Sequence, residues 1–364
     1  MVAMIEASAP GKLYIAGEYA VLEPGQPAIL VALNQYITVK LTKTDTQGSI
    51  RSSLTNHFPI PWTRRNGKVF IDERENPFAY VVQAMMITEK YAVALGKKVS
   101  FFDIEIQSDL DNKDGRKYGL GSSGAVTVAT IKALLKFYQV PYDNELIYKL
   151  AALAHLAINS NGSFGDLAAS TYGGWIAYSC FDRDWVREKL VTVPILMLLE
   201  ATWPKLAIEA LTPPENLSLL IGWTGSPAST THLVDRLNEE KDEISIYYRH
   251  FLADSRQVVQ SMIDAFKMQD LTGIQQGIRA NRRLLQDLGK SSGVHIETLS
   301  LYNLCESAED MGGAAKSSGA GGGDCGIVII DEKIDTRELF ASWKDNHIVP
   351  LPLAVHEERE YTPL

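Results

Sequence analysis

The chain has 364 residues, enough for two domains or one large α/β unit, and its hydrophobic fraction of 46% is that of an ordinary globular protein. A net charge of −9 without a basic tail or stripe argues against nucleic acid as a general partner. Three widely spaced cysteines form neither a CxxC pair nor a zinc pattern and fit a reducing compartment. No signal-peptide pattern appears, and the most apolar run, 191–199, is too short for a bilayer. We therefore expect a cytoplasmic protein with no membrane partner.

Hydrophobic periodicity predicts strands and helices in both halves of the chain. In the first half we expect strands over 28–33, 36–41, 102–107 and 174–179, and helices over 79–95, 125–138 and 145–156. Charge and proline cluster between 182 and 214, where a domain boundary is expected. In the second half we expect strands over 217–223 and 327–330, and helices over 239–268, 274–288 and 296–311.

This order of elements predicts an α+β fold of two lobes with a cleft between them. We expect an N-terminal lobe over 1–185 that binds a nucleotide, and a C-terminal lobe over 186–364 that carries a late glycine-rich loop.

The most informative segment is the glycine- and serine-rich run from Lys117 to Ala125, which leads directly into a predicted helix. Glycines let the backbone approach a ligand, and a helix start offers unpaired N–H groups and a positive dipole end, so the segment suits a phosphate group. It lacks the Gly-Lys-Ser/Thr of a Walker A loop. The polar stretch 108–117 separates it from the preceding strand, unlike a Rossmann turn, and a serine-hydrolase elbow is incomplete at Ala125. The alternative is an ordinary loop in which Ser122 or Ser123 caps the helix.

Three further segments carry groups suited to phosphoryl transfer. Lys12 lies between a Pro-Gly pair and an apolar strand and could neutralise a transferring phosphoryl group; an exposed lysine on a turn is the alternative. Glu18 could pair with Lys12 or lie at the surface. Asp166 opens a helical run of small residues, either as an N-cap or as a carboxylate beside the reacting oxygen. The glycine-dense run 316–326 separates a predicted helix from a strand, so we expect it to line a ligand rather than form a linker.

These four segments, in this order, resemble the GHMP kinases along nearly the whole chain. The matching motifs are Ala-Pro-Gly-Lys, Gly-Leu-Gly-Ser-Ser, Gly-Ser-x-x-Asp and the late glycine loop. Within that superfamily, the sequences around Lys12 and Lys316 are most similar to the bacterial phosphomevalonate kinases. The resemblance implies a two-lobed fold and transfer of a phosphoryl group from MgATP to phosphomevalonate. Mevalonate kinase, the lyase diphosphomevalonate decarboxylase and a nucleotide-binding sensor without turnover remain as alternatives.

The resemblance also implies the residues of the site. Lys12 and Asp166 match the catalytic residues, and Ser123 matches the position whose hydroxyl contacts magnesium. The residues expected to bind ATP are Asn76 at the purine, and Lys117, Gly119, Leu120, Gly121, Ser122, Ser123, Gly124 and Ala125 at the phosphates. The residues expected to bind the acceptor are Lys12, Ser163, Thr230, Thr231, His232, Lys316, Ser317, Ser318, Gly319, Ala320 and Gly321.

One departure from the relatives concerns the metal. Mevalonate kinases and galactokinases carry a helical glutamate for magnesium about three turns before the catalytic aspartate, where this chain has His155. We expect His155 to be structural, and the metal to rest on Ser122 or Ser123, the phosphates and water.

Two anionic substrates also require cations beyond Lys12. Lys117, Lys316, Arg74 and the Arg282–Arg283 pair are the candidates, and a solvated surface role is the alternative for each arginine. The oligomeric state is left open, with a homodimer as one option.

Overall fold

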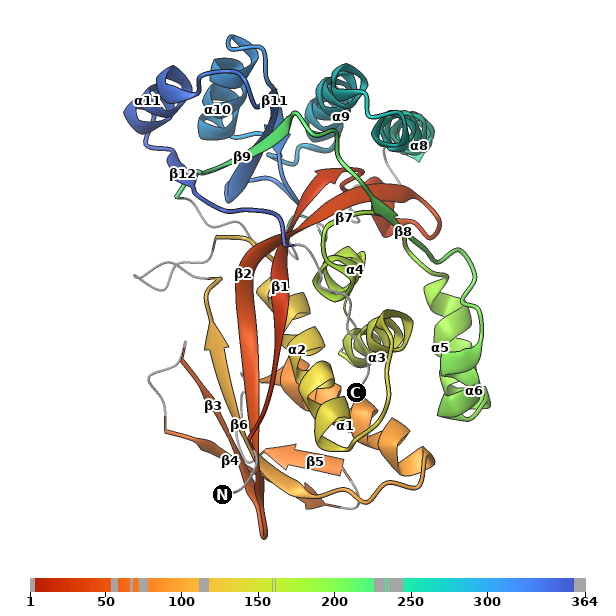
Figure 1. The fold of residues 1–364 in the computed structure, drawn as a ribbon. Helices are drawn as coiled ribbons and strands as arrows, with labels where there is room; N and C mark the ends of the chain where they lie inside the picture. Colours follow the sequence, from red (N-terminus) through yellow and green to blue (C-terminus); the bar gives the residue numbers. More distant parts are fainter. Residues whose placement is uncertain are drawn as a thin grey trace.

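The computed structural model describes residues 4–53, 58–65, 68–71, 78–110, 118–158, 160, 162–225, 233, 235 and 245–356. It confirms the expected α+β fold of two lobes (Figure 1). The larger sheet contains β1 (Ile5–Ala16), β2 (Pro27–Thr44), β3 (Gly48–Ser52), β4 (Ile60–Arg65), β5 (Lys68–Ile71), β6 (Phe101–Ser108), β7 (Trp175–Ser179) and β8 (Ala207–Leu211). The smaller sheet contains β9 (Leu217–Trp223), β10 (Ala314–Ser317), β11 (Cys325–Asp331) and β12 (Val349–Leu351), in the order β10-β11-β9-β12.

The helices divide between the two sheets. The first lobe has the short 3₁₀ helix η1 (Ala20–Leu22), α1 (Ala79–Ala94), α2 (Ser122–Phe137), α3 (Asn144–Ala157), α4 (Gly165–Tyr172), α5 (Arg183–Thr192) and α6 (Ile195–Glu200). The second has α8 (Ser245–Lys267), α9 (Leu271–Ser292), α10 (Leu299–Glu309) and α11 (Arg337–Asp345). Helix α2 packs on β1 and β2, whereas α9 and α10 pack on β10 and β11 (Figure 1).

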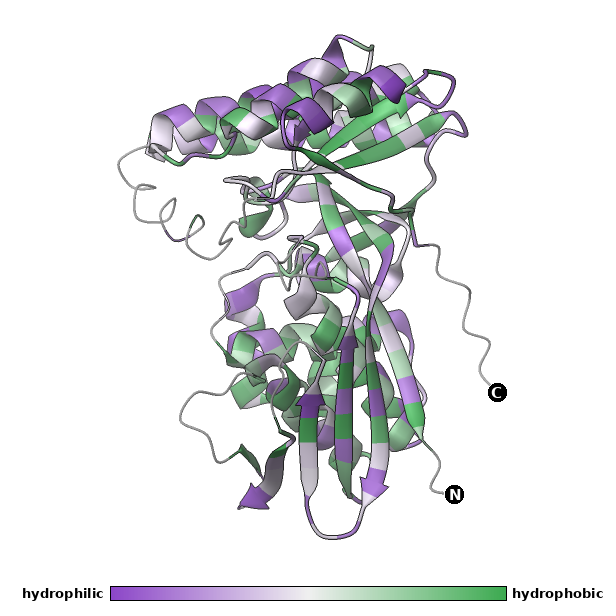
Figure 2. Cartoon of the chain, turned by 90° about the vertical axis from the view of Figure 1, so that its left-hand side faces the viewer, coloured by the Kyte–Doolittle hydropathy of each residue, from purple (hydrophilic) through white to green (hydrophobic). Residues whose placement is uncertain are grey.

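The long strand β2 organises the first lobe. Strand β1 pairs antiparallel with β2 along most of its length, while β7 pairs with the first part of β2 and β6 with the last part. Alternate residues of β6 are buried in the core of this lobe, as expected for a sheet with one buried face, and hydrophobic and hydrophilic residues alternate along the long strands in Figure 2. The expected strands over 28–33 and 36–41 are therefore one strand.

The structure also shows where the chain passes from the larger sheet to the smaller one. The larger sheet continues through β8 to Leu211, and the smaller sheet begins at Leu217. The chain thus passes from the larger to the smaller sheet between Leu211 and Leu217, at the end of the proline- and charge-rich region 182–214. This position is later in the chain than the boundary expected at 185.

All three cysteines are buried and free. Among the described residues, no helix has both the length and the apolar character to cross a membrane.

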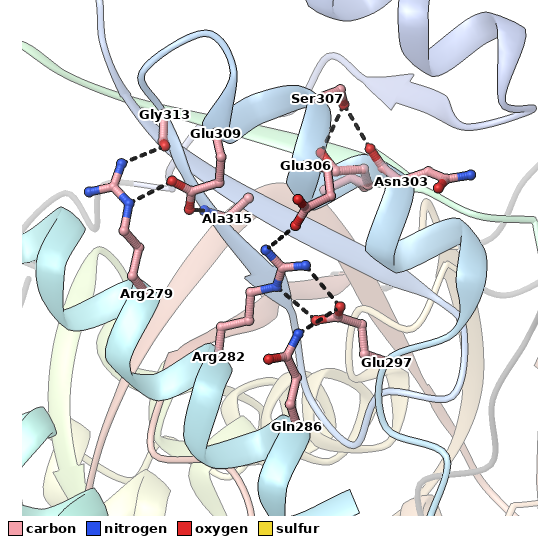
Figure 3. Close-up of polar contacts among 11 residues, drawn as sticks. Arg279, Arg282, Gln286, Glu297, Asn303, Glu306, Ser307, Glu309, Gly313 and Ala315 are labelled. Atoms are coloured by element: carbon pink, nitrogen blue, oxygen red, sulfur yellow. Dashed lines mark hydrogen bonds and ion pairs between the residues drawn. The ribbon is translucent and has the colours of Figure 1, made fainter. Parts of the chain in front are cut away.

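An ion-pair network holds the second lobe together (Figure 3). The guanidinium of Arg282 in α9 donates two hydrogen bonds to Glu297, at 2.8 and 2.9 Å, and one to Glu306 in α10, at 2.9 Å. Arg282 is buried, so it is neither the surface arginine nor the acceptor-site cation that the sequence suggested. Arg283, its neighbour, is exposed.

This network predicts a stability difference between two similar variants. Glu297→Gln should lower the free energy of unfolding by about 1.5–3 kcal/mol, because it weakens a charged hydrogen-bonding partner whose side chain is 9% exposed. Glu306→Gln is the matched control and should cost less, since the Glu306 side chain is 47% exposed. Urea denaturation measures both; equal losses would contradict the assignment.

Candidate active site

The phosphate loop leads into α2 without a side-chain cap. The N-cap residue is Gly121, which adopts the left-handed conformation with φ 77°, and no side chain caps the helix. The alternative in which Ser122 or Ser123 caps the helix is therefore wrong, because the helix itself begins at Ser122. The first N–H groups of α2 are thus left to an anion. The Lys12 N–H donates to the carbonyl of Leu120 at 2.8 Å and ties this loop to β1.

Two glycines bring α2 against the expected catalytic residues. A Cβ atom at Gly121 would lie 2.8 Å from Lys12 Cε, and one at Gly124 would lie 2.7 Å from Asp166 Oδ2. Neither position has room for a side chain unless its neighbour shifts. The start of α2, the ammonium-bearing chain of Lys12 and the carboxylate of Asp166 therefore converge on one place, as the resemblance implied.

Lys12 is buried among acidic groups rather than exposed on a turn. Its residue is only 9% exposed, and the Pro-Gly pair before it lies inside β1, next to an irregularity in the pairing with β2. Burial lowers the pKa of Lys12, and the charges of Asp166 and Asp324 oppose this shift. Asp324 is a residue that the motif comparison did not select: a Cβ atom at Gly119 would lie 2.6 Å from its carboxyl group.

Asp166 lies in the first turn of α4 and does not cap it. The N-cap is Phe164, in a left-handed conformation with φ 61°, so the N-cap interpretation of Asp166 is wrong. Ser170 of the same helix donates a hydrogen bond to the Pro10 carbonyl at 2.7 Å and fastens α4 to β1.

A pocket opens beside Lys12 on the side of the late glycine loop. Four of its lining residues were expected to bind the acceptor: Lys12, Ser163, Gly319 and Ala320. The other lining residues are Tyr14, Glu18, Tyr19, Val21, Leu22 and Gly162. Tyr14, Glu18 and Tyr19 follow Lys12 in the same motif, so their place in the chain could have indicated them.

The start of the late glycine loop attaches to the first lobe. Lys316 is fully buried and forms an ion pair with Glu18, so Glu18 neither pairs with Lys12 nor lies at the surface. The Ser318 hydroxyl bonds the backbone of Tyr14 twice, accepting from its N–H at 3.0 Å and donating to its carbonyl at 2.8 Å. Tyr19 donates to the carbonyl of Ala320 at 2.6 Å.

The remaining loop residues pack inside the second lobe. Ser317 is buried, and a Cβ atom at Gly321 would lie 2.2 Å from the carbonyl oxygen of Ile296. The structure therefore places Gly319 and Ala320 in the pocket and Lys316, Ser317, Ser318 and Gly321 behind or beside it. Asn76, Lys117, Thr230, Thr231, His232 and Arg74 lie outside the described residues.

His155 occupies a buried position behind α2. Its Nε2 lies 2.9 Å from the hydroxyl of Thr127, and its ring packs on Tyr80 at a centroid distance of 4.7 Å. Burial lowers the pKa of His155, which favours the neutral ring at neutral pH.

Comparison with known proteins shows the family of this chain. Family models described as the N-terminal domain and the C-terminal part of GHMP kinases match residues 79–174 and 262–348. A phosphomevalonate kinase of Streptomyces sp. (strain CL190) is 38% identical over 95% of both chains. The chain belongs to the GHMP kinase family. A Streptococcus pneumoniae phosphomevalonate kinase, solved with phosphomevalonate and AMPPNP, is 29% identical with a TM-score of 0.85 and covers 96% of this chain and 99% of its own. A mevalonate kinase of Pyrococcus horikoshii is 26% identical over 98% of this chain and 97% of its own.

The close contact at Gly124 generates a prediction for this GHMP kinase. Alanine normally favours a helix over glycine by about 1 kcal/mol, so Gly124→Ala should leave α2 folded. The added methyl group should displace the Asp166 carboxylate and lower kcat by on the order of 10²-fold, the scale for a misplacement of about 1 Å. Steady-state kinetics with thermal unfolding as the control measures this. An unchanged kcat would contradict the placement of Asp166.

Proposed function

We propose that this protein transfers the γ-phosphoryl group of ATP to (R)-5-phosphomevalonate, which yields 5-diphosphomevalonate and ADP in the mevalonate route to isoprenoids. The observation that carries the proposal is the convergence of the uncapped α2 start, Lys12 and Asp166 beside a pocket lined by both lobes. The identity to the Streptomyces phosphomevalonate kinase supports this choice of acceptor over mevalonate.

The nucleotide side of the site suits the phosphates of MgATP. The N–H groups at the start of α2 would receive the phosphate oxygens, because no side chain caps this helix. Magnesium prefers hard oxygen ligands and keeps several waters, so the hydroxyl of Ser123, with the phosphates, fits it. His155 offers no such ligand, because its Nε2 is already within hydrogen-bond distance of Thr127. When bound, the metal would neutralise charge on the phosphates.

Lys12 supplies the positive charge on the protein side. Phosphoryl transfer depends on positioning and on neutralising the equatorial oxygens, and a buried ammonium does this more strongly than a hydrated one. Burial lowers the pKa of Lys12, and the negative charge of Asp166 acts in the opposite direction. The carboxylate therefore helps to keep the ammonium charged.

The acceptor changes what Asp166 must do. A phosphate monoester has its second pKa near 6 and is largely ionised at neutral pH, so its oxygen needs little help from a base. We infer that Asp166 orients Lys12 and the acceptor, and accepts a proton only secondarily.

The proposal also assigns binding roles to residues outside the part of the chain that the structure describes. It further includes the location and the assembly of the whole protein. Asn76 would lie at the purine, Lys117 at the phosphates, and Thr230, Thr231 and His232 at the acceptor. A cytoplasmic location and a homodimer belong to the proposal as well, and sedimentation would test the last. The division between the lobes is the one that the two sheets give, between Leu211 and Leu217.

A panel of acceptors tests the proposed function. ADP release, measured with a coupled assay, should occur with phosphomevalonate and remain at background with mevalonate and diphosphomevalonate. Turnover of mevalonate instead would identify a mevalonate kinase. Release of CO2 from diphosphomevalonate would identify the lyase, and no ADP release with any acceptor would favour a sensor.

The role of Asp166 predicts a pH effect. Asp166→Asn should lower kcat/KM on the order of 10²-fold yet leave measurable turnover at neutral pH. Because the Asp166 charge raises the pKa of Lys12 against the effect of burial, its removal should move the alkaline limb of the kcat/KM profile to lower pH. A pH–rate series measures both effects. Complete loss of activity at every pH would instead favour Asp166 as an obligatory base.

A further inference from the structure

Tyr14 touches three segments that build the acceptor pocket. Its ring lies 5.4 Å from the Lys12 ammonium, and its backbone N–H and carbonyl are both bonded to the Ser318 hydroxyl. Its own hydroxyl lies 2.5 Å from Ser163 Oγ. Tyr14 itself lines the pocket together with Ser163. One residue of β1 therefore meets the catalytic lysine and the loop before α4 through its side chain, and the late glycine loop through its backbone.

Two hydrogen bonds reach the Ser163 hydroxyl, and in the one to Tyr14 either hydroxyl can be the donor. A serine hydroxyl has one hydrogen and two acceptor positions. The Gly165 N–H donates to Ser163 Oγ at 3.3 Å and occupies one acceptor position. Burial raises the pKa of Tyr14, so its phenol stays protonated at neutral pH and can donate to the second position.

The carbonyl of Ser163 is held separately. The Tyr178 hydroxyl donates to it at 2.7 Å, and the Tyr148 hydroxyl lies 2.8 Å from that of Tyr178. The Ser163 residue is thus fixed from the protein interior at its carbonyl and from β1 at its side chain. When Tyr14 is the donor in their shared hydrogen bond, the Ser163 hydroxyl hydrogen is the part left to face the pocket.

We propose that Tyr14 is a positioning residue that donates to Ser163 Oγ and so leaves the Ser163 hydroxyl hydrogen to bind an anionic oxygen of the acceptor. The inference rests on the proposed function for the identity of the acceptor. Its physical content is that Ser163 acts as a donor only, which suits an anion. A pocket built for a neutral hydroxyl has no need to prevent serine from accepting.

Tyr14→Phe tests this directly, because phenylalanine retains the ring beside Lys12 and the backbone bonds to Ser318. Without the phenol, the Ser163 hydroxyl is no longer held as a donor. We expect KM for phosphomevalonate to rise by about 2- to 10-fold, the range for one neutral hydrogen bond, with KM for ATP unchanged.

The same measurement in a Ser163→Ala background separates positioning from a general structural effect. If Tyr14 acts through Ser163, adding Tyr14→Phe to Ser163→Ala should raise KM for the acceptor no further. Additive effects of the two substitutions, or no change in KM with Tyr14→Phe alone, would overturn the proposal. An equal rise in KM for ATP would also overturn it, because that outcome indicates disturbance of the whole site.

Tyr36→Phe is the matched control. It also removes one tyrosine hydroxyl from a half-buried hydrogen bond, to His356 Nδ1 at 2.9 Å, but Tyr36 does not line the pocket. It should leave both KM values unchanged. Wild-type turnover of phosphomevalonate is the reference, and its absence would count against the proposed function alone. The single and double variants would then be compared with the acceptor that the wild type does turn over.

Discussion

The close approach of helix α2 to Lys12 and Asp166 is the constraint on which the site depends. Glycine at 121 and 124 removes the side chains that would otherwise separate the helix start from the ammonium and the carboxylate. The Lys12 N–H bond to Leu120 holds the loop in register with β1, and Ser170 holds α4 to the same strand. The helix start, the Lys12 side chain and the Asp166 carboxylate are therefore held at one place by contacts with β1.

The second lobe contributes through attachments to this same strand. The buried Lys316–Glu18 ion pair, the paired bonds of Ser318 to Tyr14 and the bond from Tyr19 to Ala320 all join the late glycine loop to β1 or the residues just after it. A buried ion pair adds little net stability, but removal of one of its two partners costs several kcal/mol because the other charge is left buried and unpaired. The loop is thus held in a defined place beside the pocket.

Charge explains how an acidic chain can accept two anions. Lys12 is buried, and burial acts against its charge, while the neighbouring carboxylates of Asp166 and Asp324 act for it. The cation at Lys316 is compensated by Glu18 and is fully buried, so it does not reach the pocket surface. Lys12 is therefore the basic side chain among the described residues that line the pocket.

The sequence by itself determined the fold class and the helix after the phosphate loop, because hydrophobic periodicity is a local signal. The convergence of Lys12 and Asp166 was implied only by the resemblance of the ordered motifs to a known family. It did not determine that 28–33 and 36–41 form one strand, nor that the larger sheet extends to Leu211, because strand pairing is set by distant residues. Only the tertiary structure decided the partners of buried polar groups. Glu18 meets Lys316 across 298 residues and Tyr14 meets Ser163 across 149, and no spacing along the chain encodes those contacts.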